Sequence, residues 1–269
     1  MSIITVSRGS YTKGKEIAEK LAAKLGYECI AREAIIEASR EFNIPEAKLI
    51  RALHDAPSIL DKITYGKEKF IAYYQIAFLE HLQKDNIVYH GLAGHFLLKN
   101  VPHVLKVRII ADMDERIKLE MARENISNKE AARLLKNDDE ERRRWSQHIY
   151  GVDTSDSSLY DLIIHIKKIT VEDAVEIIFN TARLDHFKTT PESREVFRQM
   201  LLTARVKLAI IDLAPDAEVY YANGIVSVKA NASPYKEEIL VKNIMQAAQS
   251  VAGVNEVNVY LMPILPFGD

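Results

Sequence analysis

The chain has 269 residues, which is room for one sizeable α/β domain and a smaller second one. Its 48% hydrophobic residues, 28% charged residues and formal net charge of −2 describe an ordinary globular protein, with no electrostatic reason to expect a nucleic-acid partner. A single cysteine, Cys29, excludes an internal disulfide. Because the sequence shows neither an apolar run of membrane-spanning length nor a basic-then-apolar leader, we expect a cytoplasmic protein.

Apolar strands and amphipathic helices alternate over residues 1–186. The expected strands cover residues 3–6, 86–91, 104–111 and 159–166, and the expected helices cover 14–25, 32–42, 45–54, 67–83, 114–124, 128–148 and 171–183. Gly26 is a helix stop, and Ser127 and Thr170 are candidate N-caps. Strands separated by helices predict an α/β fold with a parallel sheet that is covered on both faces.

The composition changes at residues 187–193, a polar stretch with a proline that is typical of a linker. Residues 194–269 then predict a small α+β unit. We expect helices over 194–213 and 236–251, a hairpin over 217–229 and a last strand over 256–262. The hairpin has the strongest local signal, because Asn223-Gly224 supplies two residues that tolerate the positive φ of a tight turn.

The first strand and the first helix flank the pattern Gly9-x-x-x-x-Gly14-Lys15, which is typical of a phosphate-binding loop. Backbone N–H groups and the positive end of the helix would face an anion, and the lysine would reach the outer phosphates. The candidate nucleotide-binding residues are Gly9, Ser10, Tyr11, Thr12, Lys13, Gly14, Lys15 and Glu16. The alternative is a surface turn before a helix, since Glu16 stands where the usual motif has Ser or Thr.

Several motifs resemble the cytidylate kinase-like family of P-loop nucleoside monophosphate kinases. They are Ser7-Arg8, Gly14, Glu16-Ile17-Ala18 and Leu21-Ala22, followed by Ala31-Arg32-Glu33, Asp114-Glu115-Arg116 and Asp139-x-x-Arg142. The resemblance implies a three-layer P-loop parallel sheet of nucleoside monophosphate kinase type over residues 1–186. Two departures stand out: Tyr11, Thr12 and Lys13 replace Gly-Ser-Gly, and Leu92 stands where the family has an arginine after Gly91.

The same resemblance implies the roles of individual residues. Lys15, Arg116 and Arg142 would be catalytic, and Arg32, Asp139 and Arg142 would bind the acceptor. Read without the family, Arg32 and the charge run at 139–144 would be solvated helix surface. His90 and His95 flank the turn at Gly91, where they would supply charge or hydrogen bonds or be ordinary polar residues. No metal-ligand set is predicted.

The C-terminal unit resembles a BON domain in its order of elements and in the run Val251-Ala-Gly253-Val254-Asn-Glu-Val257-Asn-Val259. Such domains are associated with membrane or protein contacts and carry no catalytic residues. The resemblance therefore implies a docking or regulatory unit with a protein partner or a weak membrane contact.

Together with the phosphate-binding loop pattern, the resemblance to the cytidylate kinase-like family implies ATP-dependent phosphoryl transfer to a CMP-like nucleoside monophosphate or a related small phosphorylated acceptor. ATP and Mg²⁺ would be the cofactors, with the metal held mostly through phosphates and waters and Asp112 as a possible outer ligand. Two alternatives stay open. In one, catalysis has lapsed and the protein senses nucleotide through its BON-like unit; in the other, that unit carries the function on a P-loop scaffold.

Overall fold

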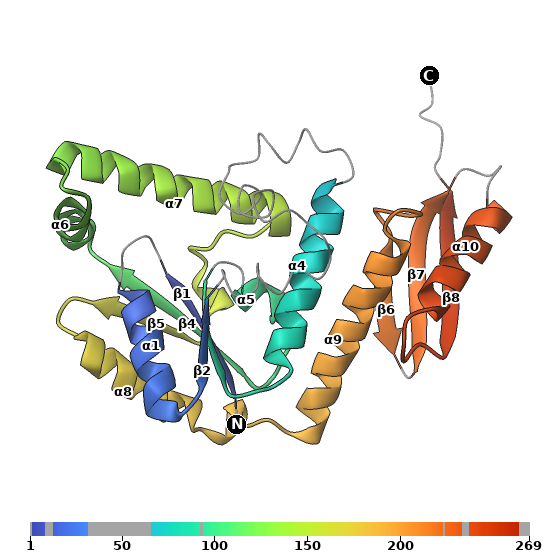
Figure 1. The fold of residues 1–269 in the computed structure, drawn as a ribbon, viewed down its shortest axis with the longest axis horizontal. Coiled ribbons are helices and arrows are strands. Elements are labelled where there is room, and N and C mark those ends of the chain that lie inside the picture. Colours follow the sequence, from blue (N-terminus) through green and yellow to red (C-terminus); the bar gives the residue numbers. More distant parts are fainter. Residues whose placement is uncertain are drawn as a thin grey trace.

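The computed structural model describes residues 2–8, 13–31, 66–91, 94–222, 224–232 and 237–263. The helices expected over 32–42 and 45–54 lie outside these ranges. Within the described ranges the N-terminal two thirds of the chain form a three-layer arrangement, with helices on both sides of one sheet (Figure 1).

Five parallel strands form this sheet in the order β2-β3-β1-β4-β5. They are β1 (Ile3–Arg8), β2 (Glu28–Ala31), β3 (Ile87–His90), β4 (Val104–Ala111) and β5 (Leu162–Ile166). The α-helices that the structure describes in this part are α1 (Gly14–Leu25), α4 (Gly66–Leu82), α5 (Gly94–Leu97), α6 (Met113–Glu124), α7 (Asn128–Tyr150) and α8 (Val171–Ala182). The predicted parallel sheet is confirmed.

Alternate residues of the central strand pack against different layers. Ile4 and Val6 join a core with α1 and α8, whereas Ile3 joins a core with α4 on the opposite face. Because side chains alternate along a strand, Thr5 and Ser7 lie on the same face as Ile3. The face toward α4 and α5 therefore carries polar side chains as the central strand approaches its carboxyl end.

Local signals in the sequence mark several of the element ends. Gly26 closes α1 at φ 68°, and Ser127 and Thr170 form capping boxes at the starts of α7 and α8. The strand expected from residue 159 begins instead at Leu162, because Ser157–Leu159 forms a short 3₁₀ turn capped by Asp156. The edge strand β2 and the four-residue helix α5 were not predicted.

The C-terminal part consists of α9 (Pro191–Ile210), β6 (Glu218–Ala222), β7 (Ile225–Ala232), α10 (Glu237–Gln249) and β8 (Glu256–Pro263). β6 and β7 are antiparallel, with Ala222 opposite Ile225 and Gly224 at φ 87°, so the predicted hairpin is confirmed. β8 returns through α10 to lie parallel to β7. The order of these three strands in their sheet is β6-β7-β8.

Helix α9 belongs to both parts of the molecule. It begins at Pro191 rather than at residue 194, because the Thr190 side chain caps it, and its first half places Phe197 and Leu201 in the core beneath α4. Its second half places Val206 and Ile210 in the core of the second sheet. Figure 1 shows α9 running between α4 and β6. That residues 194–269 are a separate domain after a linker at 187–193 stays a prediction.

Candidate functional site

The candidate site lies at the carboxyl end of β1, where the chain order in the sheet changes direction. β1 has β3 on one side and β4 on the other, so the connections that follow β1 and β4 lead to opposite edges of the sheet. Ligands of open parallel sheets bind at such a point. Residues 9–12 of the predicted phosphate-binding loop follow β1 here, outside the described ranges, so their binding role stays a prediction.

Helix α1 presents its N-terminus to this point. Its N-cap residue, Lys13, makes no side-chain capping hydrogen bond, so the capping of the first turn is left to groups outside that side chain. Lys13 has φ 61°, a left-handed conformation that glycine adopts most easily, and it stands at a position where the family has glycine. Gly14 lies against the Arg8 side chain: a Cβ at Gly14 would sit 2.8 Å from Cδ of Arg8. Gly14 therefore lets the start of α1 lie against the Arg8 side chain, where a residue with a side chain would clash.

The predicted phosphate-binding lysine, Lys15, lies on the solvent side of the first turn. Its side chain is 62% exposed and its Nζ is 3.7 Å from Oε1 of Glu19, one turn along the helix. Glu16 similarly pairs with Lys20 at 2.9 Å. In this structure both side chains therefore follow the surface of α1.

Arg116 and Asp139 are brought together by the packing of α6 on α7. The guanidinium of Arg116 donates to both carboxylate oxygens of Asp139, at 2.8 and 2.9 Å, and Arg116 is only 7% exposed. Ile117 of α6 packs with Ala131 and Leu135 of α7 and holds the two helices in contact. Two residues that the family resemblance assigns to the nucleotide pocket thus bind each other here.

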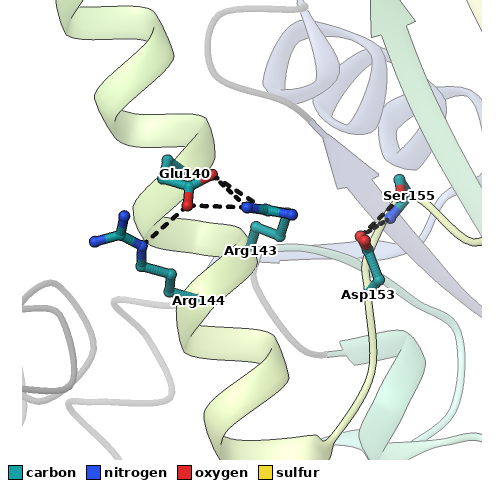
Figure 2. Close-up of polar contacts among 5 residues, drawn as sticks. All are labelled: Glu140, Arg143, Arg144, Asp153 and Ser155. Carbon is teal, nitrogen blue, oxygen red and sulfur yellow. Dashed lines mark hydrogen bonds and ion pairs between the residues drawn. The ribbon is translucent and has the colours of Figure 1, made fainter.

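Arg142 links the long helix α7 to the central strand. Its Nη1 donates to the backbone carbonyl of Arg8, the last residue of β1, at 3.2 Å. The two arginines that follow behave differently, because Arg143 and Arg144 both bind the carboxylate of Glu140 on the same helix (Figure 2). Arg142 therefore contacts the carboxyl end of β1, the strand that precedes the predicted phosphate-binding loop.

A buried cluster that the sequence analysis did not identify lies on the α4-side face of the sheet. The Tyr160 hydroxyl donates to the carbonyl of Thr154 at 2.9 Å and accepts from Nη1 of Arg108 at 3.1 Å. It also lies 3.2 Å from Nε2 of His95. The hydroxyl has one proton, which Thr154 receives, so Nε2 of His95 is the donor in that contact. A charged residue in the middle of the apolar strand β4 was the sequence signal for Arg108.

His95 is neutral in this cluster. It is 3% exposed, and burial, with smaller effects from the charges of Arg108 and Lys106, lowers its pKa to about 3. Charge, hydrogen bonding and an ordinary polar role were considered for His95; in the structure it makes a buried hydrogen bond to Tyr160 and carries no charge. His90 is also buried, at the end of β3.

Asp112, the possible outer ligand of a metal, is engaged by a lysine and a histidine of the protein. Its Oδ1 lies 2.9 Å from Nε2 of His165, its Oδ2 accepts from Nζ of Lys167, and the hydrogen bond from Lys167 is the main reason that its pKa is lowered. Within the described ranges no cluster of three or more His, Cys, Asp or Glu residues could hold a metal ion. Arg32 and Leu92 lie outside those ranges.

Comparison with known proteins agrees with this arrangement. Residues 3–168 match the model of the cytidylate kinase-like family. The chain belongs to this family. Cytidylate kinases of Sulfolobus acidocaldarius and Staphylothermus marinus are relatives of the chain: the first is 27% identical over 164 residues (60% of this chain, 84% of the relative) and the second 29% over 175 residues (63% and 88%).

The fold of this cytidylate kinase-like chain also occurs in an uncharacterized protein of Eubacterium ventriosum. The TM-score is 0.53 at 20% identity, with 68% of this chain and 98% of the other covered. At that identity the likeness concerns the fold alone. None of the helices within the described ranges is long and apolar enough to span a bilayer.

Proposed function

We propose that this chain transfers a phosphoryl group from ATP to a nucleoside monophosphate, with CMP as the first acceptor to test. The observation that carries the proposal is the bond from Arg142 to the Arg8 carbonyl, which holds a cation of α7 over the carboxyl end of β1. Membership of the family and two relatives that are named cytidylate kinases support the same chemistry.

In the proposed reaction an oxygen of the acceptor's phosphate attacks the γ-phosphorus of ATP, a new P–O bond forms, and ADP leaves. No general base is needed, because the attacking oxygen is already anionic near pH 7. The backbone of the loop after β1, the N-terminus of α1 and Lys15 would hold the ATP phosphates. Arg142 would stabilise the charge of the transferring group, and Arg32 would orient the acceptor. Arg116 forms an ion pair with Asp139 in this structure. It would contribute to catalysis when bound nucleotide takes Asp139 as its own partner and releases the guanidinium.

Mg²⁺ would have few protein ligands in this site. The described residues offer no carboxylate cluster for it, and Asp112 is bound to Lys167 and His165. The proposal therefore leaves Mg²⁺ to phosphate and water oxygens, an arrangement in which this ion commonly binds with nucleotides.

The test is ADP release from ATP–Mg²⁺ in the presence of CMP, UMP, AMP or GMP in turn. We expect one pyrimidine monophosphate to stimulate release, and Arg142→Ala to lower kcat by about 10²–10³-fold, as for the loss of one preorganised charge donor. Arg144→Ala, which removes an exposed arginine of the same helix, is the matched control and is expected to leave kcat unchanged. Nucleotide binding without ADP release would contradict the proposal and favour the sensor alternative.

For the C-terminal part we propose a docking role, as the resemblance to a BON domain implies. The supporting observation is that the sheet face turned away from α9 and α10 leaves Tyr220, Tyr260 and Met262 about half exposed, at 48%, 52% and 56%. Pull-down from a lysate with and without a Tyr220→Ser/Tyr260→Ser double substitution tests this role. Equal recovery of bound proteins by both forms would contradict it.

A further inference from the structure

The turn after β3 lacks a cation that the family places there. Leu92 follows Gly91 at the position of the family's phosphate-clamping arginine. Losing such a charge-assisted contact weakens phosphate binding substantially. Buried His95, three residues further on, cannot replace the charge, because its pKa is about 3.

The strand register brings Arg108 close to this turn from the other side of β1. Val6 pairs with His90 of β3, and the next residue, Ser7, pairs with Arg108 of β4. Arg108 therefore lies in the row of residues that leads across β1 to the end of β3, about 10 Å or two strand spacings away. Its guanidinium and His95 of α5, the helix that follows the turn, contact the same Tyr160 hydroxyl.

The described partners of Arg108 are uncharged. Nη1 donates to the Tyr160 hydroxyl, and the guanidinium lies 5.3 Å from the centre of the Tyr160 ring. The carboxylate that its charge reaches is that of Asp153, whose pKa it helps to lower. However, Oδ1 of Asp153 already accepts from the backbone N–H and the hydroxyl of Ser155, each at 2.8 Å (Figure 2). By contrast, Arg116 makes a two-point ion pair with Asp139.

A buried hydroxyl without a hydrogen-bond partner among the described residues lies on the same face of the sheet. Thr5 is 1% exposed, and its Oγ1 has no hydrogen-bond partner among the described residues. Thr5 and Ser7 alternate with the core residues of β1, so both face the side that Arg108 faces. An anion in front of Arg108 would thus meet one guanidinium with donors to spare, while the Thr5 hydroxyl lies one row further back on the same face, opposite Lys106.

We propose that Arg108 binds the phosphate of the acceptor and so replaces the arginine that is absent at Leu92. The inference rests on the proposed function, since it takes the acceptor to be a nucleoside monophosphate. It makes Arg108 a substrate-binding residue on β4, in a position where periodicity alone predicts an apolar side chain.

The experiment compares the dissociation constants of CMP and cytidine, which differ only by the phosphate, for the full-length protein and for Arg108→Gln. We expect Arg108→Gln to weaken CMP binding by about 10- to 100-fold, in line with the loss of a hydrogen bond to a charged group, and to leave cytidine binding and the KM for ATP unchanged. Arg144→Gln, which removes a surface charge of α7, is the matched control and is expected to change none of the three.

Two further variants separate phosphate binding from a structural role. Tyr160→Phe removes the hydroxyl that Arg108 binds but keeps its charge, so CMP is expected to bind more tightly to it than to Arg108→Gln. Leu92→Arg in the Arg108→Gln background returns an arginine to the turn and is expected to restore CMP affinity. If Arg108→Gln does not fold, Arg108→Lys is the substitute, with part of the CMP affinity and all of the cytidine affinity retained.

Equal weakening of CMP and cytidine would overturn the inference, because it would show that Arg108 only supports the fold of the site. Unchanged CMP binding in Arg108→Gln would overturn it as well. Failure of the wild-type protein to bind any nucleoside monophosphate would instead remove the proposed function on which the inference rests, so the two failures are distinguished before any variant is made.

Discussion

Arg116 of α6 and Asp139 of α7 form a two-point ion pair whose guanidinium is almost wholly buried. A guanidinium that loses its carboxylate in such a place keeps the cost of its burial and loses the two bonds that the carboxylate supplied. We expect Asp139→Asn to lower the free energy of unfolding by about 1–2 kcal/mol, a value reduced because Asp139 is 35% exposed. Urea denaturation at neutral pH measures it.

Arg143 and Glu140 supply the control for that prediction. They form an ion pair of similar length on the same helix, but Arg143 is 57% exposed and Glu140 38%. Glu140→Gln is therefore expected to leave the free energy of unfolding nearly unchanged, because solvent screens this exposed pair. Equal effects of Asp139→Asn and Glu140→Gln on the free energy of unfolding would mean that the burial of Arg116 adds nothing to the stabilisation by its ion pair.

Lys13 holds a left-handed backbone conformation at the start of α1, with φ 61°. A residue with a Cβ is strained there by about 1–2 kcal/mol, whereas glycine is not, although glycine adds entropy to the unfolded chain. We expect Lys13→Gly to raise the free energy of unfolding by up to about 1 kcal/mol. Thermal and urea unfolding would both report the change.

Asn125 is the comparison position for Lys13, because it ends α6 with a similar φ of 52°. Asparagine tolerates this conformation better than lysine does, since its short amide bonds locally to the backbone. Asn125→Gly is accordingly expected to raise the free energy of unfolding by less than Lys13→Gly does. A loss of stability in Lys13→Gly would show that the lysine side chain contributes contacts that outweigh the strain.

The parts of the fold that could be predicted are those with local signals. Gly26, Ser127 and Thr170 act within a single helical turn, and the ends that they mark are confirmed. β2 was missed because its four residues, at the edge of the sheet, show no clear alternation and become a strand by pairing with β3. Its existence depends on contacts far away in the sequence.

The candidate site, too, has a part that sequence spacing predicts and a part that it does not. Spacing alone places Asp139 and Arg142 on one helical face, yet it does not say that Asp139 binds Arg116 while Arg142 reaches the Arg8 carbonyl. These partners are chosen by how α6 crosses α7 and how α7 crosses the sheet. The cluster of His95, Tyr160 and Arg108 was missed for the same reason, since it joins three segments that are distant in the chain.

The neutral His95 makes stability depend on pH. Its pKa is about 3 in the folded protein, against an ordinary value of 6.5. Stability is therefore highest above pH 6.5, where the ring is neutral in both states, and falls as the pH drops from 6.5 toward 3, because only the unfolded chain then binds the proton. Between pH 6.5 and 5.5 the loss is about 1 kcal/mol, because the unfolded chain takes up a proton that the folded protein excludes. Urea unfolding at both pH values measures this difference.

His95→Gln isolates that effect, because a glutamine amide can donate to Tyr160 as Nε2 does but does not titrate. The variant is expected to lose less stability than the wild type between pH 6.5 and 5.5. Lowered pKa values of exposed carboxylates such as Asp153 and Asp156 act at lower pH and are common to both proteins. Identical pH dependence in the two proteins would mean that folding does not lower the pKa of His95.

Helix α9 is expected to couple the stability of the two sheets. Phe197 is 4% exposed in the core beneath α4, and Val206 and Ile210 are buried in the core of the second sheet, so a single rigid helix joins both cores. Phe197→Ala is expected to cost about 3–5 kcal/mol through lost burial and a cavity, whereas Ile239→Ala, at a residue 68% exposed, is expected to cost under about 0.5 kcal/mol. In urea, followed by far-UV circular dichroism and calorimetry, the wild type is expected to unfold in one transition. Two separate transitions, of which Phe197→Ala moves only the first, would show that the cores fold independently.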